Sequence, residues 1–73
     1  MPRSIAITGE MIRLGQLLKL AGVADGGAEA KAMITGGEVA VNGEPELRRG
    51  RQLRDGDVVI AGGEELQVQA GGR

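Results

Sequence analysis

The sequence of 73 residues contains no cysteine, no histidine and no aromatic residue. Without cysteine, disulfides, thiolate metal sites and cysteine nucleophiles are excluded. Without histidine, the chain also lacks the commonest general base and the commonest metal ligand. We therefore expect a protein that is not an enzyme and that binds neither a metal nor any other cofactor.

The chain also lacks a large surplus of charge of either sign. Its formal net charge is −1 and its isoelectric point is about 5.3, whereas nucleic-acid-binding domains are usually basic. Binding to a nucleic acid would therefore require the cations to gather on one face. No apolar run is long enough to span a membrane, and the N-terminus lacks the apolar stretch of a secretory signal. We expect a cytoplasmic protein without membrane contact or a small-molecule substrate.

What the chain does contain is 41% hydrophobic residues and 14 glycines. The core must consist of Leu, Ile, Val, Met and Ala. A chain of this size buries only about 60% of the surface that its unfolded form exposes, so this core is thin. The glycines predict short elements joined by tight turns. No linker or internal repeat divides the chain, which predicts one domain over residues 1–73.

The N-terminal part predicts a strand followed by a helix. Ile5 and Ile7 alternate with smaller or polar residues, as in a short strand over 3–8. The following Thr8-Gly9-Glu10 is typical of a helix start. Apolar residues then recur at spacings of three and four, which predicts a helix over 11–21. Its apolar stripe consists of Met11, Leu14, Leu17, Leu18 and Ala21.

One glycine interrupts this helix. Gly15 should cost about 1 kcal/mol relative to alanine in a helix interior. It is either a tolerated weak spot or a place where another backbone approaches closely. Both interpretations stay open from the sequence.

A second, shorter helix is expected where Ala30 and Ile34 share one face. Asp25 is a candidate N-cap, and the glycines at 26–27 leave backbone amides uncovered at the helix start, which favours anion binding. Lys31 lies about one turn inside this helix. The glycines at 36–37 supply the positive φ that ends a helix.

The remainder of the chain predicts about four short strands. Val39 and Val41 alternate before Asn42-Gly43, a strong signal for a hairpin with a type I′ turn. Pro45 cannot donate a hydrogen bond, so the returning strand is short or lies at an edge. We expect Leu47 and Leu53 to contact the core.

A second turn at Asp55-Gly56 precedes a buried strand over 58–60. The glycines at 62–63 turn the chain into a last strand with Leu66 and Val68, and residues 70–73 form a loose tail. The order of elements predicts an α+β fold, in which two antiparallel helices cover one face of a small, mostly antiparallel sheet.

An arginine cluster follows the predicted hairpin. Arg48, Arg49, Arg51 and Arg54 fall within seven residues that contain no acid. The window 44–57 holds four arginines and four acids, so the arginines could simply balance the acids on a wet surface. Against this, the acids bracket the cluster instead of alternating with it. The planar fork of arginine also suits bidentate phosphate contacts. Both interpretations remain open on this feature alone.

Three segments resemble the S4-type RNA-binding domain, also called the αL motif, and its short stand-alone bacterial members in particular. They are LGQLLKLAG at 14–22, GGAEAKAMITGGEVAVNGE at 26–44 and RRGRQLRDGDVV at 48–59. The resemblance implies two helices packed on a small sheet, with an RNA-binding surface on the helices and the hairpin. It assigns to that surface Lys19, Lys31, Arg48, Arg49 and Arg51. The chain departs from the family pattern at Gly15, where aspartate is frequent, and at Gln52, where a basic residue is expected.

These features together predict a module that binds the phosphate backbone of structured RNA, such as ribosomal or tRNA-like RNA. Without aromatic residues, the usual stacking of single-stranded bases is not available, so phosphates and RNA shape should dominate recognition. Two alternatives remain. The Gly71-Gly72 pair before Arg73 is similar to the tail of ubiquitin-like β-grasp sulfur carriers, although only one strand precedes the first helix. The arginines could also bind an acidic protein in a ribonucleoprotein complex.

Overall fold

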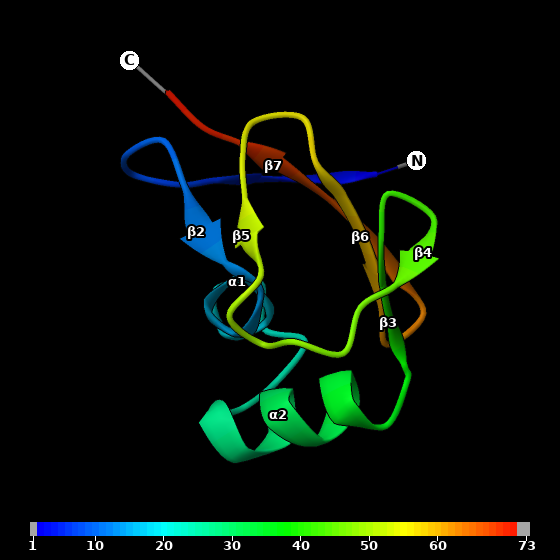
Figure 1. The fold of residues 1–73 in the computed structure, drawn as a ribbon. Coiled ribbons are helices and arrows are strands. Elements are labelled where there is room, and N and C mark those ends of the chain that lie inside the picture. Colours follow the sequence, from blue (N-terminus) through cyan, green and yellow to red (C-terminus); the bar gives the residue numbers. More distant parts are fainter. Residues whose placement is uncertain (1, 72–73) are drawn as a thin grey trace.

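A five-stranded sheet and two helices enclose the core of the molecule (Figure 1). The computed structural model describes residues 2–71. Figure 1 shows α1 nearly along its axis and α2 from the side, so the two helices cross where they meet. The elements of the described range are, in chain order, β1 (Arg3–Ala6), β2 (Ile12–Arg13), α1 (Leu14–Leu20), α2 (Gly27–Thr35), β3 (Val39–Val41), β4 (Glu44–Pro45), β5 (Gln52–Leu53), β6 (Val58–Ala61) and β7 (Glu64–Gln69).

The main sheet has the strand order β1-β7-β6-β3-β4. Its first and last strands in the chain, β1 and β7, pair in parallel, and the other neighbours pair antiparallel. A separate two-stranded ladder joins β2 to β5, with Ile12 opposite Leu53. The prediction of an α+β fold with a mostly antiparallel sheet is confirmed. No helix among residues 2–71 has the length and apolar character needed to cross a membrane.

The core lies on one face of the main sheet. Along β3, β6 and β7 the side chains alternate between buried and more exposed positions, because successive residues of a strand point to opposite faces. Both helices turn apolar side chains toward the buried face, and Leu53 of β5 joins them. The largest fully buried side chains are Leu14, Leu17, Leu18, Ile34, Val39, Val41, Leu53, Val59, Leu66 and Val68.

The first helix begins later than predicted. Residues 12–13 form β2, and α1 starts at Leu14, so Thr8-Gly9-Glu10 is not a helix start. Pairing with β5, about forty residues further along the chain, takes these two residues out of the helical pattern. Met11, which was expected in the apolar stripe, is 37% exposed.

The second helix ends as predicted but has a different cap. Gly37 has a φ of +79°, and the N–H of Glu38 donates to the carbonyl oxygen of Met33 over 3.0 Å, which closes the last turn. The N-cap is Gly26, not Asp25. The backbone N–H of Asp25 instead donates to the side chain of Glu29, which therefore reaches back over the helix start.

Two further apolar residues that were expected inside lie outside. Leu47 is 58% exposed, while Leu53 is fully buried as predicted. Ile60 is 47% exposed although it belongs to the strand that was predicted to be buried. The run 58–60 is continuously apolar, but the sheet has only one covered face, so only Val59 of this run points into the core.

Two turns are tied together beside the sheet. Asn42 and Gly43 have φ values of +51° and +86°, which confirms the predicted turn. The side chain of Asn42 donates to Asp57 Oδ1 over 3.1 Å and accepts from the N–H of Val58 over 2.9 Å. Asp57 also accepts from the N–H of Arg54 over 2.8 Å.

The last strand is followed by a segment that the structure describes only to Gly71. The N–H of Ala70 donates to Asp55 Oδ1 over 2.9 Å, and that of Gly71 donates to the carbonyl oxygen of Gly9 over 3.3 Å. Asp55 therefore serves the turn and the end of β7, in keeping with its predicted role in a turn. The predicted loose tail extends to Gly72 and Arg73, which lie outside the described residues.

Candidate nucleic-acid interface

The loop over residues 46–51, here called the arginine loop, is fastened to the start of α1 by backbone hydrogen bonds. The N–H of Leu14 donates to the carbonyl oxygen of Arg51 over 2.9 Å, and that of Gly15 donates to the carbonyl oxygen of Arg49 over 3.0 Å. The first N–H groups of a helix have no partner inside the helix, so the loop satisfies two of them. A Cβ at position 15 would lie 3.6 Å from Arg49 Cβ. The Arg49 backbone therefore lies against position 15, but at an ordinary van der Waals distance that does not require glycine.

The loop is also fastened from its other side by a buried carboxylate. Glu46 is only 7% exposed. Its Oε2 accepts from both Nε and the backbone N–H of Arg48 at 3.1 Å, and its Oε1 accepts from Arg51 Nη1 at 2.7 Å. These hydrogen bonds, first that from Arg51 and then those from Arg48, lower the pKa of Glu46 to about 2 although burial acts in the opposite direction. Glu46 is therefore ionised at neutral pH.

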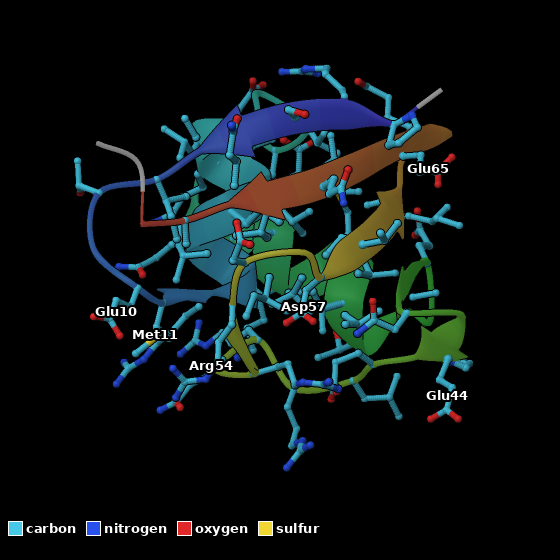
Figure 2. All side chains as sticks on the ribbon, turned by 90° about the horizontal axis from the view of Figure 1, so that it is seen from above. Glu10, Met11, Glu44, Arg54, Asp57 and Glu65 are labelled. Atoms are coloured by element: carbon cyan, nitrogen blue, oxygen red, sulfur yellow. The ribbon has the colours of Figure 1, made fainter. Side chains whose placement is uncertain are left out.

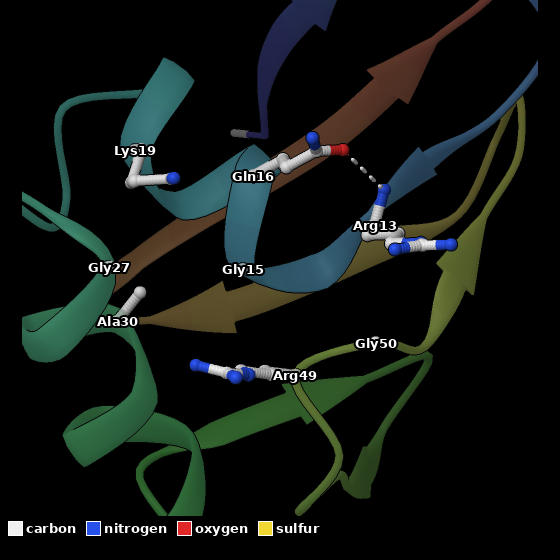
Figure 3. A pocket seen from close by; sticks show the side chains of 8 residues that line it. All are labelled: Arg13, Gly15, Gln16, Lys19, Gly27, Ala30, Arg49 and Gly50. Carbon is white, nitrogen blue, oxygen red and sulfur yellow. Dashed lines mark hydrogen bonds between the residues drawn. The ribbon is translucent and has the colours of Figure 1, made fainter.

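The third arginine of the loop points elsewhere. Arg49 forms no ion pair with any residue of the described range, and Figure 3 shows its side chain extending from the loop toward α2. It reaches into a hollow of about 280 Å³ between α1, α2 and the loop. This first hollow is lined by Arg13, Gly15, Gln16, Lys19, Gly27, Ala30, Arg49 and Gly50. None of these lining residues is acidic.

A second hollow adjoins the first at Gly50. Its volume is about 530 Å³, and it is lined by Arg48, Gly50, Arg51 and Gln52. Although Arg48 is bound to Glu46, its side chain remains 79% exposed. We call the five cations of the two hollows the cationic face: Arg13, Lys19, Arg48, Arg49 and Arg51. Within residues 2–71, only the carboxylate of Glu46 forms ion pairs with these five cations, which leaves four formal positive charges.

The five residues that the sequence assigned to an RNA-binding surface are distributed unequally. Lys19 and Arg49 line the first hollow, and Arg48 and Arg51 line the second. Lys31 is exposed on α2 and lines neither hollow. The structure thus brings four of them around Gly50, and the role of each in RNA binding stays a prediction.

Arg13 is a member of the cationic face to which the sequence patterns did not point. It is the last residue of β2 and the N-cap of α1, and its N–H donates to Gln16 Oε1 at 3.4 Å. The spacing of residues could have indicated Arg13, because positions 13, 16 and 19 fall at intervals of three along the predicted helix and share a side of it. The alternative interpretation, that the arginines of the cluster balance neighbouring acids, applies to Arg48 and Arg51, which pair with Glu46.

The acids are spread over more than one side of the molecule. Figure 2 shows Glu44 of β4 and Glu65 of β7 across the view from Arg54, whereas Glu10 lies on the same side as Arg54. Glu64 of β7 is paired with Arg3 of β1 at 2.6 Å. Folding therefore groups five cations around the two hollows, although the net charge of the chain is close to zero. Within residues 2–71, no three acidic side chains come close enough together to hold a metal ion.

Comparison with known families finds one match over most of the chain. The sequence model of the S4 domain matches residues 5–69. A protein of Bacillus subtilis (strain 168) named "Probable ribosome maturation protein RlbA" is 52% identical over 69 residues, which cover 93% of this chain and 97% of that protein. YbcJ of Escherichia coli (strain K12), provisionally named as an RNA-binding protein, is 39% identical over 59 residues, or 81% of this chain and 84% of that protein.

A similar fold occurs in a solved ribosomal protein structure. The 30S ribosomal protein S4e of Thermoplasma acidophilum superimposes with a TM-score of 0.61 at 22% identity. The match covers 80% of this chain but only 31% of that protein. At this level of identity the similarity concerns the fold alone.

Proposed function

Because the chain belongs to the S4-domain family, we propose that it is an RNA-binding protein whose cationic face holds phosphate groups of a structured RNA. The observation that carries this proposal is the grouping of five cations around two adjoining hollows, with Glu46 as the only carboxylate of residues 2–71 that pairs with them. Phosphate contacts supply most of the sequence-independent affinity of nucleic-acid-binding proteins.

The proposed mode of binding follows from the residue types present. Arg49 and Lys19 approach the first hollow from different elements, so a phosphate placed there meets cations from two sides. Arginine offers parallel N–H groups that match two oxygens of one phosphate. The chain contains no aromatic side chain on which a base could stack. Recognition would therefore depend on phosphate positions and on the shape of a folded RNA.

Ribosomal RNA, or a tRNA-like RNA, is the class of partner we propose. The names of the two bacterial relatives, one a ribosome maturation protein and the other an RNA-binding protein, support this choice. The proposed role is binding without catalysis, in the bacterial cytoplasm, and it needs no cofactor. The match to the S4 domain over residues 5–69 and the presence of a second helix, α2, favour RNA binding over the sulfur-carrier alternative.

Binding to ribosomal RNA fragments at several salt concentrations tests the proposal. If each of the five cations neutralises one phosphate, the logarithm of the binding constant should fall with the logarithm of salt concentration with a slope of roughly −3.5 to −4.5. Arg49→Ala should weaken binding about five- to tenfold for different RNA sequences alike. Arg54→Ala is the matched control, because Arg54 is exposed but lines neither hollow. Equal affinity of Arg49→Ala and the unchanged protein would contradict the proposal.

The cellular partner can be identified by crosslinking in cells followed by sequencing of the attached RNA. Recovery of one structured RNA region is the expected result. A protein partner that survives RNase treatment, without enriched RNA, would favour the protein-binding alternative instead.

A further inference from the structure

Glu46 is the only buried charged side chain within residues 2–71. We propose that Glu46 is a positioning residue for RNA binding, which holds the arginine loop in the shape that directs Arg49 into the first hollow. This inference rests on the proposed function and adds the residue whose hydrogen bonds set the geometry of the proposed RNA-binding site.

Electrostatic attraction to RNA does not explain a carboxylate at this position. A negative charge within a cationic face weakens the attraction of that face for phosphate. Burying a carboxylate also costs desolvation free energy, and a buried ion pair is often no more stabilising than apolar residues of similar size. Its hydrogen bonds stabilise the folded state, and we infer that they also hold the loop in one conformation.

The hydrogen bonds of Glu46 span the loop from one end to the other. Its two oxygens receive three donors, two from Arg48 and one from Arg51. Arg49 lies between these two residues in sequence and is left free to extend toward α2. These three hydrogen bonds, here called the clamp, hold the backbone N–H of Arg48 on one side of Arg49 and the side chain of Arg51 on the other, without engaging the Arg49 guanidinium.

Glu46 is itself fixed to the rigid part of the fold. Its N–H donates to the carbonyl oxygen of Val39 in β3 at 3.0 Å. On the opposite side, the carbonyl groups of Arg49 and Arg51 accept hydrogen bonds from the start of α1. The loop is thus held between the sheet and α1. A loop that is already ordered loses less conformational entropy when RNA binds, and this increases affinity.

For Glu46→Gln, the loss of a negative charge and the loss of loop positioning predict opposite changes in RNA affinity. Glu46→Gln removes a negative charge from the cationic face, so charge alone predicts tighter binding to RNA. If Glu46 acts by positioning, binding should instead become weaker, by about five- to tenfold. Glu64→Gln is the matched control, because it removes the same charge from the ion pair with Arg3, outside the cationic face. The control should bind RNA as tightly as the unchanged protein or slightly more tightly.

Glu46→Asp separates the two effects at constant charge. Its side chain is one methylene shorter and cannot reach both Arg48 Nε and Arg51 Nη1 without a shift of the loop. Charge alone predicts unchanged affinity, whereas positioning predicts a loss of about two- to fivefold. NMR spectra of the free protein should show shifted amide signals for Arg48 and for Gly15, whose N–H groups donate to the clamp and to the loop.

The possible outcomes distinguish this inference from the proposed function. If Arg49→Ala weakens binding but Glu46→Gln and Glu46→Asp bind as tightly as the unchanged protein, Glu46 does not position the loop. If Arg49→Ala has no effect, the proposed function itself fails. Should Glu46→Gln not fold at the assay temperature, Glu46→Asp decides, with thermal unfolding confirming that it is folded. Weaker binding by folded Glu46→Asp, with the amide shifts, supports the inference.

Discussion

The backbone N–H of Gly15 donates a hydrogen bond to the carbonyl oxygen of Arg49 over 3.0 Å. Through this contact the arginine loop lies directly on the first turn of α1, and a side chain at position 15 would point at Arg49. The helix therefore controls both where the loop backbone lies and how much room the first hollow has. Gly15 therefore affects both the packing of the loop and the proposed RNA-binding site.

Replacing Gly15 tests this arrangement. A Cβ at this position would lie at an ordinary van der Waals distance, 3.6 Å, from Arg49 Cβ and its carbonyl oxygen. Gly15→Ala should therefore fold normally and gain up to about 1 kcal/mol of stability, because alanine favours the helix. Thermal and urea unfolding measure this gain. Gly15→Leu should fold as well, but its longer side chain should crowd the first hollow and weaken RNA binding relative to Gly15→Ala. Equal RNA affinity of the two variants would contradict the assignment of the first hollow.

The pH dependence of stability should report on Glu46. Its pKa in the folded protein is about 2, below its usual value of 4.5. A carboxyl group with a depressed pKa in the folded state stabilises the fold above its unfolded pKa, and this contribution is lost as the pH falls through the folded pKa. The free energy of unfolding should therefore decrease between pH 4.5 and pH 2. Urea unfolding over this range should show a weaker pH dependence in Glu46→Gln. If Glu46→Gln loses stability over the same range as steeply as the unchanged protein, Glu46 is not the responsible group.

The side chain of Asn42 should contribute to stability without affecting RNA binding. Asn42→Gly keeps the positive φ that the turn requires but removes the hydrogen bonds to Asp57 and Val58. Loss of these two bonds should lower the free energy of unfolding by about 1–2 kcal/mol. Because Asn42 lines neither hollow, RNA affinity at a temperature where the variant is folded should stay the same. A large loss of affinity in the folded variant would extend the interface to this turn.

Features that depend on neighbouring residues were predictable from the sequence. The type I′ turn at Asn42, the end of α2 at the glycines 36–37 and the buried leucines of α1 all follow from local spacing and from glycine backbone preferences. Features that depend on distant partners were not. The start of α1 was misplaced because β2 pairs with β5, a segment far away in the sequence.

The candidate site shows the same division. Arg48, Arg49 and Arg51 stand out as a cluster in the sequence, whereas Glu46 looks like one of several acids that flank it. Its special role depends on burial against β3, which no local pattern reveals. The prediction that Ile60 is buried was wrong for a related reason, since a run of apolar residues does not show how many faces of a sheet are covered.

Arg13 and Lys31 distinguish two assignments of the RNA-binding surface. The fold favours Arg13, whereas the family resemblance implies Lys31. Arg13 lines the first hollow beside Arg49, while Lys31 lies outside both hollows. Each substitution to alanine removes one positive charge, so their long-range electrostatic effects are similar. If the cationic face holds the phosphates, Arg13→Ala should weaken binding about fivefold and flatten the salt dependence by about one phosphate contact. Filter binding measures both variants, and Lys31→Ala should have the smaller effect. The reverse order would move the interface onto α2 and restore Lys31 as one of its central residues.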